Sequence, residues 1–370
     1  MKHKQTAALG IGLARGIFPP LAALVFLALT EWVARGELTA ETWAEYIRPH
    51  YESYVLSWLL LALIWAVVDA VTRLAPLATL AAGGAGLIPA AVNFYTLQLR
   101  GEPFLPWDLT QMKEAAGVAA AAGLKVQPSM VWAGGILLGM TVLSFFLYRR
   151  RGRPVLPVRL AGIAASVAAL LALVFGVYLQ PAVTQSFGIY PDAWMQDRYY
   201  RWYGVITGFM TNLTNLEIDA PEDYSEDAVN ALLDEVEAAG KIETGPNFPD
   251  SYAAVEKTPT ILYVMDESYW DVSELEQYGV TFDTDISPNL HALQQTSAHG
   301  RVYSPSFGGG TCDVEFEALT GYSVGFLPSG CKPYQQHVTH PMFALPSYLK
   351  DRGYQTAAVH CYYAKYWSRN

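Results

Sequence analysis

The chain has 370 residues, of which 52% are hydrophobic and only 16% are charged, a balance too apolar for a protein that is soluble throughout. The formal net charge is −10, and residues 186–370 hold 25 acidic against 10 basic side chains, which argues against nucleic acid as a partner. Three cysteines are too few for a disulfide scaffold. The composition therefore predicts a membrane part followed by an acidic, water-soluble part.

Five apolar stretches approach the roughly 20 residues that a membrane-spanning helix needs, at residues 16–33, 54–72, 76–99, 130–147 and 160–179. The first has no small-residue cleavage site before Glu31 and Trp32, so it is interpreted as a retained span rather than a signal peptide. Basic residues in short loops stay on the cytoplasmic side, and they gather at the N-terminus and after the second and fourth stretches. The sequence thus predicts a multi-pass protein of the cell membrane, with a cytoplasmic N-terminus and an extracellular C-terminal part.

Two features within the spans have competing interpretations. Gly83, Gly84 and Gly86 interrupt the third stretch, which favours close packing between helices. Asp69, near the end of the second stretch, is either a functional intramembrane carboxylate or the partner of Arg73 in an ion pair. The spacing of one helical turn between Asp69 and Arg73 favours the ion pair.

Three domains are expected: a five-helix membrane domain at 1–180, juxtamembrane helices and a linker at 181–259, and a domain with catalytic motifs at 260–370. Aromatic and charged residues alternate between 190 and 203, which indicates either a helix in the outer headgroup layer or aromatic side chains that pack the soluble part onto the spans. An amphipathic helix follows, with Asp223 and Glu226 spaced as a capping box.

The segment TILYVM, at 260–265, is a continuously apolar run with β-branched and aromatic members, as a parallel strand covered on both faces requires. Glu267 follows at the carboxyl end of this predicted strand, where open α/β sheets place their ligands. A carboxylate at that position suits a hard metal ion, and an ordinary loop residue is the alternative.

A glycine-rich turn, FGGGTCD at 307–313, leads into an expected helix that Gly321 ends. The glycines let the backbone approach a ligand closely, and the first N–H groups of such a helix suit a phosphate or sulfate oxygen. Thr311 would begin the helix, where the common alternative role of a threonine is N-cap. The turn lacks the lysine of a P-loop.

Together these motifs resemble the lipoteichoic acid synthase family, which groups with the phosphoglycerol transferases in the alkaline phosphatase and sulfatase superfamily. The resemblance rests on Glu267 after an apolar run, on Thr311 in GGGTCDVEFEALTG, and on the segment HCYYAKYWSRN. In that segment His360, Trp367 and Arg369 match the family's H…W-x-R pattern. The resemblance implies a multi-span α-helical membrane domain of five helices followed by an α/β domain of the sulfatase type, present only in its N-terminal part.

The resemblance also implies a role for each matching residue. Glu267 is expected to bind a divalent cation, usually Mn²⁺, which Thr311 also touches, and Thr311 is the expected nucleophile. Trp367, Arg369 and His360 are expected to hold glycerophosphate; the alternatives are a core aromatic, a surface charge and a loop histidine. The implied reaction moves glycerophosphate from phosphatidylglycerol, through a phospho-threonine, to a glycerophosphate polymer or glycolipid acceptor in lipoteichoic acid synthesis.

The cysteines give two further predictions. Sulfatase activity is disfavoured, because Cys312 is not followed by the x-Pro-x-Arg of a formylglycine motif. Cys312 and Cys331 lie on the predicted extracellular side, where disulfides persist, so we predict that they are bonded and clamp the loop of Thr311 to residues 328–333. Cys361 is left unpaired.

One departure from the family leaves several functions open. The family completes its metal site with an Asp-His pair and a further histidine, and no such segment occurs before Asn370. The chain is therefore expected to be an N-terminal fragment, inactive by itself, or a degenerate non-catalytic relative. The functions considered are a phosphoglycerol transferase of the lipoteichoic acid synthase type, a phosphoethanolamine or glucan phosphoglycerol transferase, and a non-catalytic membrane protein that binds an envelope polymer.

Overall fold

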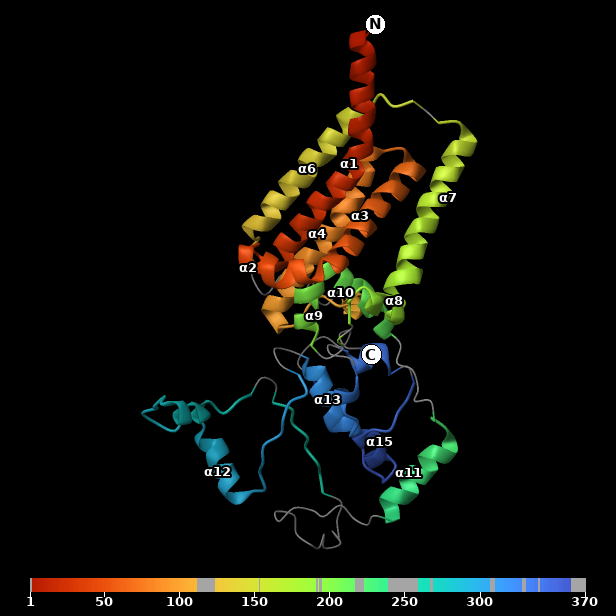
Figure 1. Ribbon diagram of the computed structural model, residues 1–370. Coiled ribbons are helices and arrows are strands. Elements are labelled where there is room, and N and C mark those ends of the chain that lie inside the picture. Colours follow the sequence, from red (N-terminus) through yellow and green to blue (C-terminus); the bar gives the residue numbers. More distant parts are fainter. Residues whose placement is uncertain are drawn as a thin grey trace. The chain divides into compact units, whose positions relative to one another are not determined.

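The computed structural model describes residues 2–111, 124–152, 154–190, 192, 195–216, 223–238, 259–266, 269–306, 310–327, 331–338 and 340–360. Figure 1 draws the chain as a ribbon. The chain divides into two compact units, one comprising Met1–Glu217 with Phe307–Asn370 and the other comprising Ile218–Ser306. The domain limits at residues 180 and 259 stay a prediction.

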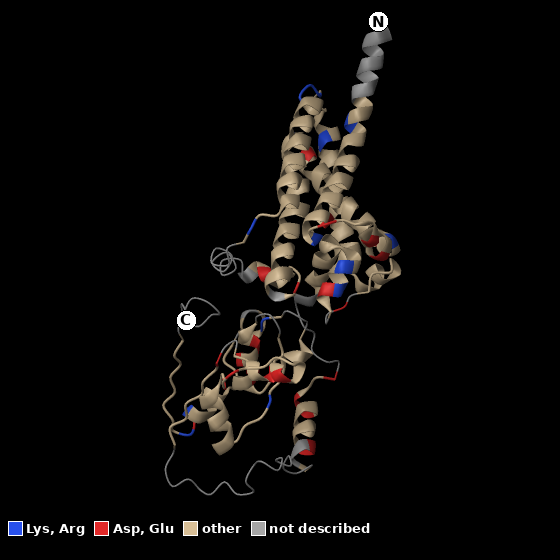
Figure 2. Ribbon diagram, turned by 90° about the vertical axis from the view of Figure 1, so that its left-hand side faces the viewer, with Lys and Arg blue, Asp and Glu red and all other residues tan. Residues whose placement is uncertain are grey.

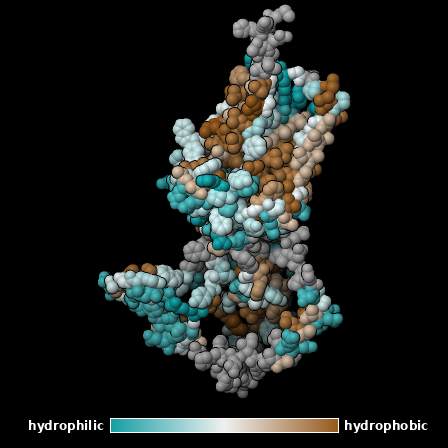
Figure 3. All heavy atoms as spheres, in the orientation of Figure 1, coloured by the Kyte–Doolittle hydropathy of each residue, from teal (hydrophilic) through white to brown (hydrophobic). Residues whose placement is uncertain are grey.

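Five long helices form the part of the chain that the sequence predicts to lie in the membrane, called the membrane part below. They are α1 (Lys2–Arg35), α3 (Tyr51–Thr72), α4 (Ala75–Arg100), α6 (Pro128–Tyr148) and α7 (Leu156–Leu173), the last continued by a π-helical turn, η4 (Val174–Tyr178). Five segments of the described residues are long and apolar enough to cross a membrane, and each overlaps one predicted span. Hydrophobic side chains cover much of these helices in Figure 3. The number of apolar helices expected from the sequence is thus confirmed.

Prolines and left-handed residues set the ends of these helices. Helices α4, α6 and α7 each carry a proline in the first turn, where its missing N–H removes no helical hydrogen bond. Helix α3 is followed by Arg73 with φ 62°, whose N–H bonds the carbonyl of Asp69 at 2.8 Å. This tight stop lets α4 begin at Ala75, so α3 and α4 form a hairpin with a very short connection.

Small residues let the helices approach closely. A Cβ placed on Gly86 of α4 would collide with the hydroxyl of Thr30 on α1, and one placed on Gly83 would collide with Leu137 of α6. The predicted role of these glycines in helix packing is therefore confirmed for Gly83 and Gly86. Gly84 differs, because a Cβ there would make only ordinary contact with Ile88 of the same helix.

We expect Gly86→Ala to lower the stability of the helix bundle by about 1–3 kcal/mol, because the added methyl group must displace Thr30, whose hydroxyl already bonds the carbonyl of Phe26 at 2.8 Å. Gly84→Ala is the matched control on the same helix. Thermal unfolding of the detergent-solubilised protein, followed by tryptophan fluorescence, compares the two variants. Equal unfolding midpoints for both would contradict the packing role of Gly86.

An ion pair joins the end of α3 to the loop after α6. Arg151 donates from Nη1 and Nη2 to the two carboxylate oxygens of Asp69, at 2.6 and 2.7 Å. Asp69 is thus ion-paired, but its partner is Arg151 and not Arg73 as expected. The left-handed conformation of Arg73 ends α3, and its guanidinium donates instead to the carbonyl of Gly152 at 2.7 Å. In Figure 2, Lys and Arg occur at both ends of the helices, with few acidic residues beside them at this end and more Asp and Glu among them at the other.

Three short helices cover the opposite end of the bundle: α8 (Pro181–Ser186), α9 (Gln196–Tyr203) and α10 (Val205–Asn212). Tyr199 and Tyr203 of α9 are buried in the same hydrophobic core as the spans. Thr207 of α10 lies 2.9 Å from the hydroxyl of Ser57 on α3 and donates to the carbonyl of Ser53 at 3.0 Å. The aromatic segment therefore packs onto the ends of the spans.

Shorter elements complete both units. In the membrane part they are α2 (Ala40–Thr42), η1 (Trp43–Ile47), η2 (Arg48–His50), η3 (Pro106–Gln111) and η5 (Leu213–Leu216). The second unit holds α11 (Glu226–Ala238), η6 (Val272–Tyr278) and α12 (Pro288–Thr296), and the chain after residue 306 forms α13 (Thr311–Thr320), η7 (Val324–Phe326), α14 (Pro333–Gln336) and α15 (Leu345–Lys350). Helix α11 is the expected amphipathic helix, but Ser225, not Asp223, accepts a hydrogen bond from its first turn, from the N–H of Ala228 at 3.1 Å.

The expected α/β character of the C-terminal part is not supported, because the described residues contain no β-strand. Residues 260–265 have no regular secondary structure, and Leu262 and Val264 are 85% and 71% exposed where a doubly covered strand would bury them. A parallel strand is held by hydrogen bonds to its neighbours. Within the described residues no second strand supplies those bonds, so the apolar run alone does not make a strand.

A charged cluster connects η6 and α12 in the second unit. The ring nitrogens of His291 lie 2.8 Å from Oδ1 of Asp285 and 3.0 Å from Oδ2 of Asp271. The hydrogen bonds with Asp271 and Asp285 raise the pKa of His291. The hydroxyl of Ser273, together with His291, lowers the pKa of Asp271. Each shift favours the charged form, so the cluster is an ion pair in mildly acidic solution.

We expect the cluster to contribute most to stability at pH values between the ordinary pKa values of aspartate and histidine, about 3.9 and about 6.5. The contribution of His291 is complete below its ordinary pKa and is lost as the pH rises through the raised value. The contribution of Asp271 is complete above its ordinary pKa and is lost as the pH falls through the lowered value. An NMR titration checks this, and a wild-type His291 that titrates below the ordinary histidine value would contradict it.

Candidate active site

The candidate nucleophile Thr311 is the first residue of α13. Gly310, the residue before it, has φ 76° and ψ 31°, a left-handed conformation that glycine adopts without steric cost. Gly310 also occupies the N-cap position, so the alternative role of N-cap does not belong to Thr311. Thr311 is half-buried and lies at the positive end of the helix dipole. Residues 307–309 of the glycine-rich turn lie outside the described residues.

Local contacts hold α13 in place at its far end and along its side. The N–H of Gly321, which has φ 77°, bonds the carbonyl of Glu317 at 2.8 Å and ends the helix as predicted. The carboxylate of Glu317 accepts from the N–H of Val324 at 2.7 Å and ties η7 to the helix. Phe316 packs edge-to-face on Tyr334 of α14, with 5.6 Å between ring centroids. These contacts give the N-terminus of α13 a fixed local support.

A buried ion pair holds the first turn of α13 to the start of α14. Nζ of Lys332 donates to Oδ2 of Asp313 at 2.7 Å, and the two side chains are only 7% and 6% exposed. Burial alone would lower the pKa of Lys332, but the adjacent carboxylate of Asp313 outweighs it and raises that pKa. The ammonium therefore stays charged at neutral pH. Because Asp313 lies two residues after Thr311, the pair fixes the turn that carries the candidate nucleophile.

Cys312 and Cys331 are the sequence neighbours of this ion pair, so the structure brings the two cysteine-bearing segments together. Both thiols are free and buried, and the predicted disulfide is not formed in the structure. Burial raises the pKa of each thiol to about 12. Thiolate is the reactive form, so at neutral pH these thiols are expected to react slowly.

The disulfide remains a prediction with a direct test. After unfolding without reductant, Ellman's reagent is expected to find Cys361 alone if Cys312 and Cys331 are bonded. Reaction of all three cysteines under those conditions would dispose of the disulfide. Reduction before unfolding provides the reference in which all three must react.

The other predicted site residues are described only in part. Glu267, Trp367 and Arg369 lie outside the described residues, so their roles toward a metal ion and glycerophosphate stay predictions. His360 is exposed and belongs to no helix. Of the expected site, the structure thus establishes the position of Thr311 at a helix N-terminus and the support of that helix.

The described side chains do not by themselves form a cation site. Among them no group of three or more His, Cys, Asp or Glu residues is arranged to hold a metal ion. The site expected around Glu267 and Thr311 would need ligands beyond these residues, because a divalent cation takes at least four ligands in most protein sites.

Sequence reasoning missed Lys332 as a positioning residue. Asp313 carried a signal, because an acidic residue in the first turn of a helix is favoured by the dipole. Its partner lies 19 residues later, after a turn, with no periodic pattern to connect them. Only the folded arrangement of α13 and α14 identifies the pair.

Comparison with known proteins finds a family match over the C-terminal part of the chain. Residues 259–370, which include Thr311 and α13, match the Sulfatase family model. This stretch is thus similar to the sulfatase domain of the alkaline phosphatase and sulfatase superfamily. The match does not single out the lipoteichoic acid synthases, so that narrower family stays a prediction.

A particular relative comes from Rhizobium meliloti (strain 1021) and bears the name "Putative cyclic beta-1,2-glucan modification protein". It is 34% identical to this chain over 181 residues, which make up 49% of the chain and 26% of the relative. The chain therefore spans about a quarter of the length of this relative. No solved structure matches the chain.

Proposed function

We propose that the full-length protein is a membrane-bound phosphoglycerol transferase that modifies a glucan. The observation that carries the proposal is the position of Thr311 at the N-terminus of α13, inside the stretch that matches the Sulfatase family. A hydroxyl at the positive end of a helix dipole suits attack on a phosphate ester. The five apolar helices suit a lipid donor, because they would keep the enzyme in the membrane that holds it.

The proposed reaction has two steps. In the first, the hydroxyl oxygen of Thr311 attacks the phosphorus of phosphatidylglycerol, the bond from phosphorus to the diacylglycerol oxygen breaks, and diacylglycerol leaves with the proton. In the second, a glucan hydroxyl attacks the phosphorus of glycerophospho-Thr311, and the threonine oxygen leaves and takes up the proton. The helix dipole of α13 stabilises the negative charge on the phosphoryl oxygens in both steps.

The choice of acceptor rests on the named relative. The Rhizobium meliloti protein is named for cyclic beta-1,2-glucan, which supports a glucan rather than lipoteichoic acid as acceptor. Phosphatidylglycerol as donor, and the outward orientation of the chain after α7, rest on the motif resemblance and on the distribution of basic residues. A divalent cation, with Mn²⁺ as the first candidate, belongs to the proposal because sulfatase-type domains usually require one.

The test uses the full-length protein in nanodiscs of phosphatidylglycerol with a soluble β-1,2-glucan. We expect diacylglycerol release and a glucan that gains glycerophosphate by mass spectrometry, both lost with EDTA and restored by Mn²⁺. Phosphatidylethanolamine nanodiscs test the phosphoethanolamine alternative, and a glycolipid acceptor tests the lipoteichoic acid alternative. Absence of diacylglycerol in every arm, with glucan still bound, would contradict the proposal and favour the non-catalytic binding protein.

A further inference from the structure

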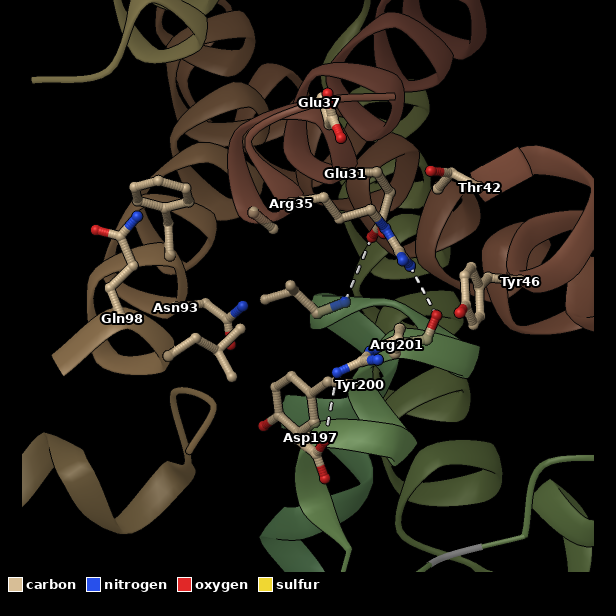
Figure 4. A pocket seen from close by; sticks show the side chains of 14 residues that line it. Glu31, Arg35, Glu37, Thr42, Tyr46, Asn93, Gln98, Asp197, Tyr200 and Arg201 are labelled. Atoms are coloured by element: carbon tan, nitrogen blue, oxygen red, sulfur yellow. Dashed lines mark hydrogen bonds and ion pairs between the residues drawn. The ribbon is translucent and has the colours of Figure 1, made fainter. Parts of the chain in front are cut away.

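A pocket of about 410 Å³ lies at the end of the helix bundle opposite the Asp69–Arg151 ion pair (Figure 4). Four segments supply its walls: the end of α1 with Glu37 after it, the α2–η1 segment, the second half of α4, and helix α9 with the first residue of α10. Its volume falls in the range of small-ligand sites, about 300–1,000 Å³. The distribution of basic residues predicts this end to face outward. None of its residues belongs to the candidate site around Thr311.

The charges of the pocket disfavour an anionic ligand. Arg35 is paired with Glu31 at 3.0 Å, and Arg201 is paired with Asp197 at 3.4 Å. Glu37 adds one more carboxylate, so the acidic side chains of the lining outnumber the basic ones. A phosphate entering this pocket would lose water and gain no uncompensated positive charge. A neutral ligand meets no such cost.

Two hydrogen-bond donors in the pocket are available to a ligand. Asn93 is 2% exposed, and its Oδ1 accepts from the N–H of Phe104 at 2.9 Å. Its amide nitrogen points into the pocket in Figure 4 and donates to no residue in the part of the chain that the structure describes. Arg35 uses Nε and Nη2 for its hydrogen bonds, which leaves Nη1 available. Both groups can therefore donate to the oxygen atoms of a ligand that enters the pocket.

The rest of the lining suits a sugar. The half-buried rings of Tyr46 and Phe94 offer apolar surface against which the C–H groups of a sugar ring can pack. The exposed amide of Gln98 and the carboxylate of Glu37 can exchange hydrogen bonds with hydroxyl groups. Apolar faces combined with donors and acceptors are what a neutral, hydroxyl-rich ligand requires.

We infer that this pocket binds a sugar unit of the glucan acceptor and holds that polymer at the membrane surface. The identity of the sugar rests on the proposed function, whereas the neutral, hydroxyl-rich character of the ligand rests on the pocket. Vicinal hydroxyls also occur in the glycerol headgroup of phosphatidylglycerol, which carries an adjacent phosphate. The charge of the pocket favours the glucan over that headgroup.

Calorimetric titration of the detergent-solubilised 370-residue chain with a linear β-1,2-glucan oligosaccharide tests the inference without any turnover. Tyr46→Ala removes a ring, and Gln98→Ala removes an amide, at the pocket wall. Their matched controls are Tyr51→Ala and Gln185→Ala, exposed residues outside the pocket. We expect wild-type binding to weaken about tenfold in each pocket variant, as one lost contact of this kind predicts, and to stay unchanged in the controls.

Three results would overturn the inference. The first two are no binding of the oligosaccharide by the wild type, and equal affinities in the pocket and control variants. Binding of phosphatidylglycerol nanodiscs that is tighter than glucan binding, and weakened by Tyr46→Ala, would also overturn it and assign the pocket to the lipid. The proposed transfer reaction can be contradicted independently of the binding site. Glucan binding at the pocket without transfer in the full-length protein would contradict the proposed function but not the proposed binding site. Transfer to glucan that is unaffected by Tyr46→Ala would contradict the binding site but not the proposed function.

Discussion

Lys332→Met is expected to destabilise the α13–α14 segment by about 3–5 kcal/mol, because it leaves the carboxylate of Asp313 buried without its counter-charge. Methionine keeps a long, unbranched side chain, so the lost charge and not a lost volume is the main change. Hydrogen exchange measured on peptides from α13 and α14 reports the effect locally. Faster exchange is expected in both helices of the variant.

Two further variants distinguish the loss of this buried ion pair from the loss of an exposed one. The double substitution Asp313→Leu with Lys332→Met removes both charges and is expected to regain most of the lost protection. Arg301→Met breaks the pair of Arg301 with Glu274 at 2.9 Å, but Arg301 is 76% exposed, so an effect below about 1 kcal/mol is expected. Equal small effects of Lys332→Met and Arg301→Met would show that burial adds nothing to the Asp313–Lys332 pair.

The membrane helices could be predicted from sequence because their signal is local. A run of about 20 apolar residues is enough to indicate a helix that can cross a membrane. All five predicted runs correspond to helices in the structure. Partners across the bundle carry no such signal. Asp69 has a basic residue one turn away in Arg73, yet it pairs with Arg151, which the fold brings from another loop. The pocket beside Asn93 likewise draws its walls from four separate segments.

In the candidate site, too, the features with a local sequence signal could be predicted and those that depend on distant residues could not. Gly310, Thr311 and Gly321 are placed as their local chemistry predicts, because a left-handed residue before and after a helix is a property of the segment itself. The run at 260–265 has the composition of a strand, but a strand also needs neighbours, and the described residues contain none. Lys332 was missed for a related reason, since its role depends on a partner 19 residues away.

In the full-length protein, Thr311→Ala is expected to reduce diacylglycerol release by at least about a thousandfold, because alanine offers no oxygen to form the phosphate ester. Thr311→Ser keeps a hydroxyl and is expected to retain measurable turnover. Without glucan, intact-protein mass spectrometry is expected to find glycerophosphate on the wild type and the serine variant, and none on the alanine variant.

A structural effect of Thr311→Ala can be told apart from a chemical one. Gly310, not Thr311, occupies the N-cap position of α13, so the helix is expected to keep its hydrogen-exchange protection in the alanine variant. Thr296→Ala, at an exposed threonine of α12, is the matched control and is expected to leave turnover unchanged. If Thr311→Ala protein with normal protection still released diacylglycerol at the wild-type rate, Thr311 would not be the nucleophile. Another oxygen would then have to attack the phosphorus and accept the glycerophosphoryl group, and the position of Thr311 at the start of α13 would no longer carry the proposed function.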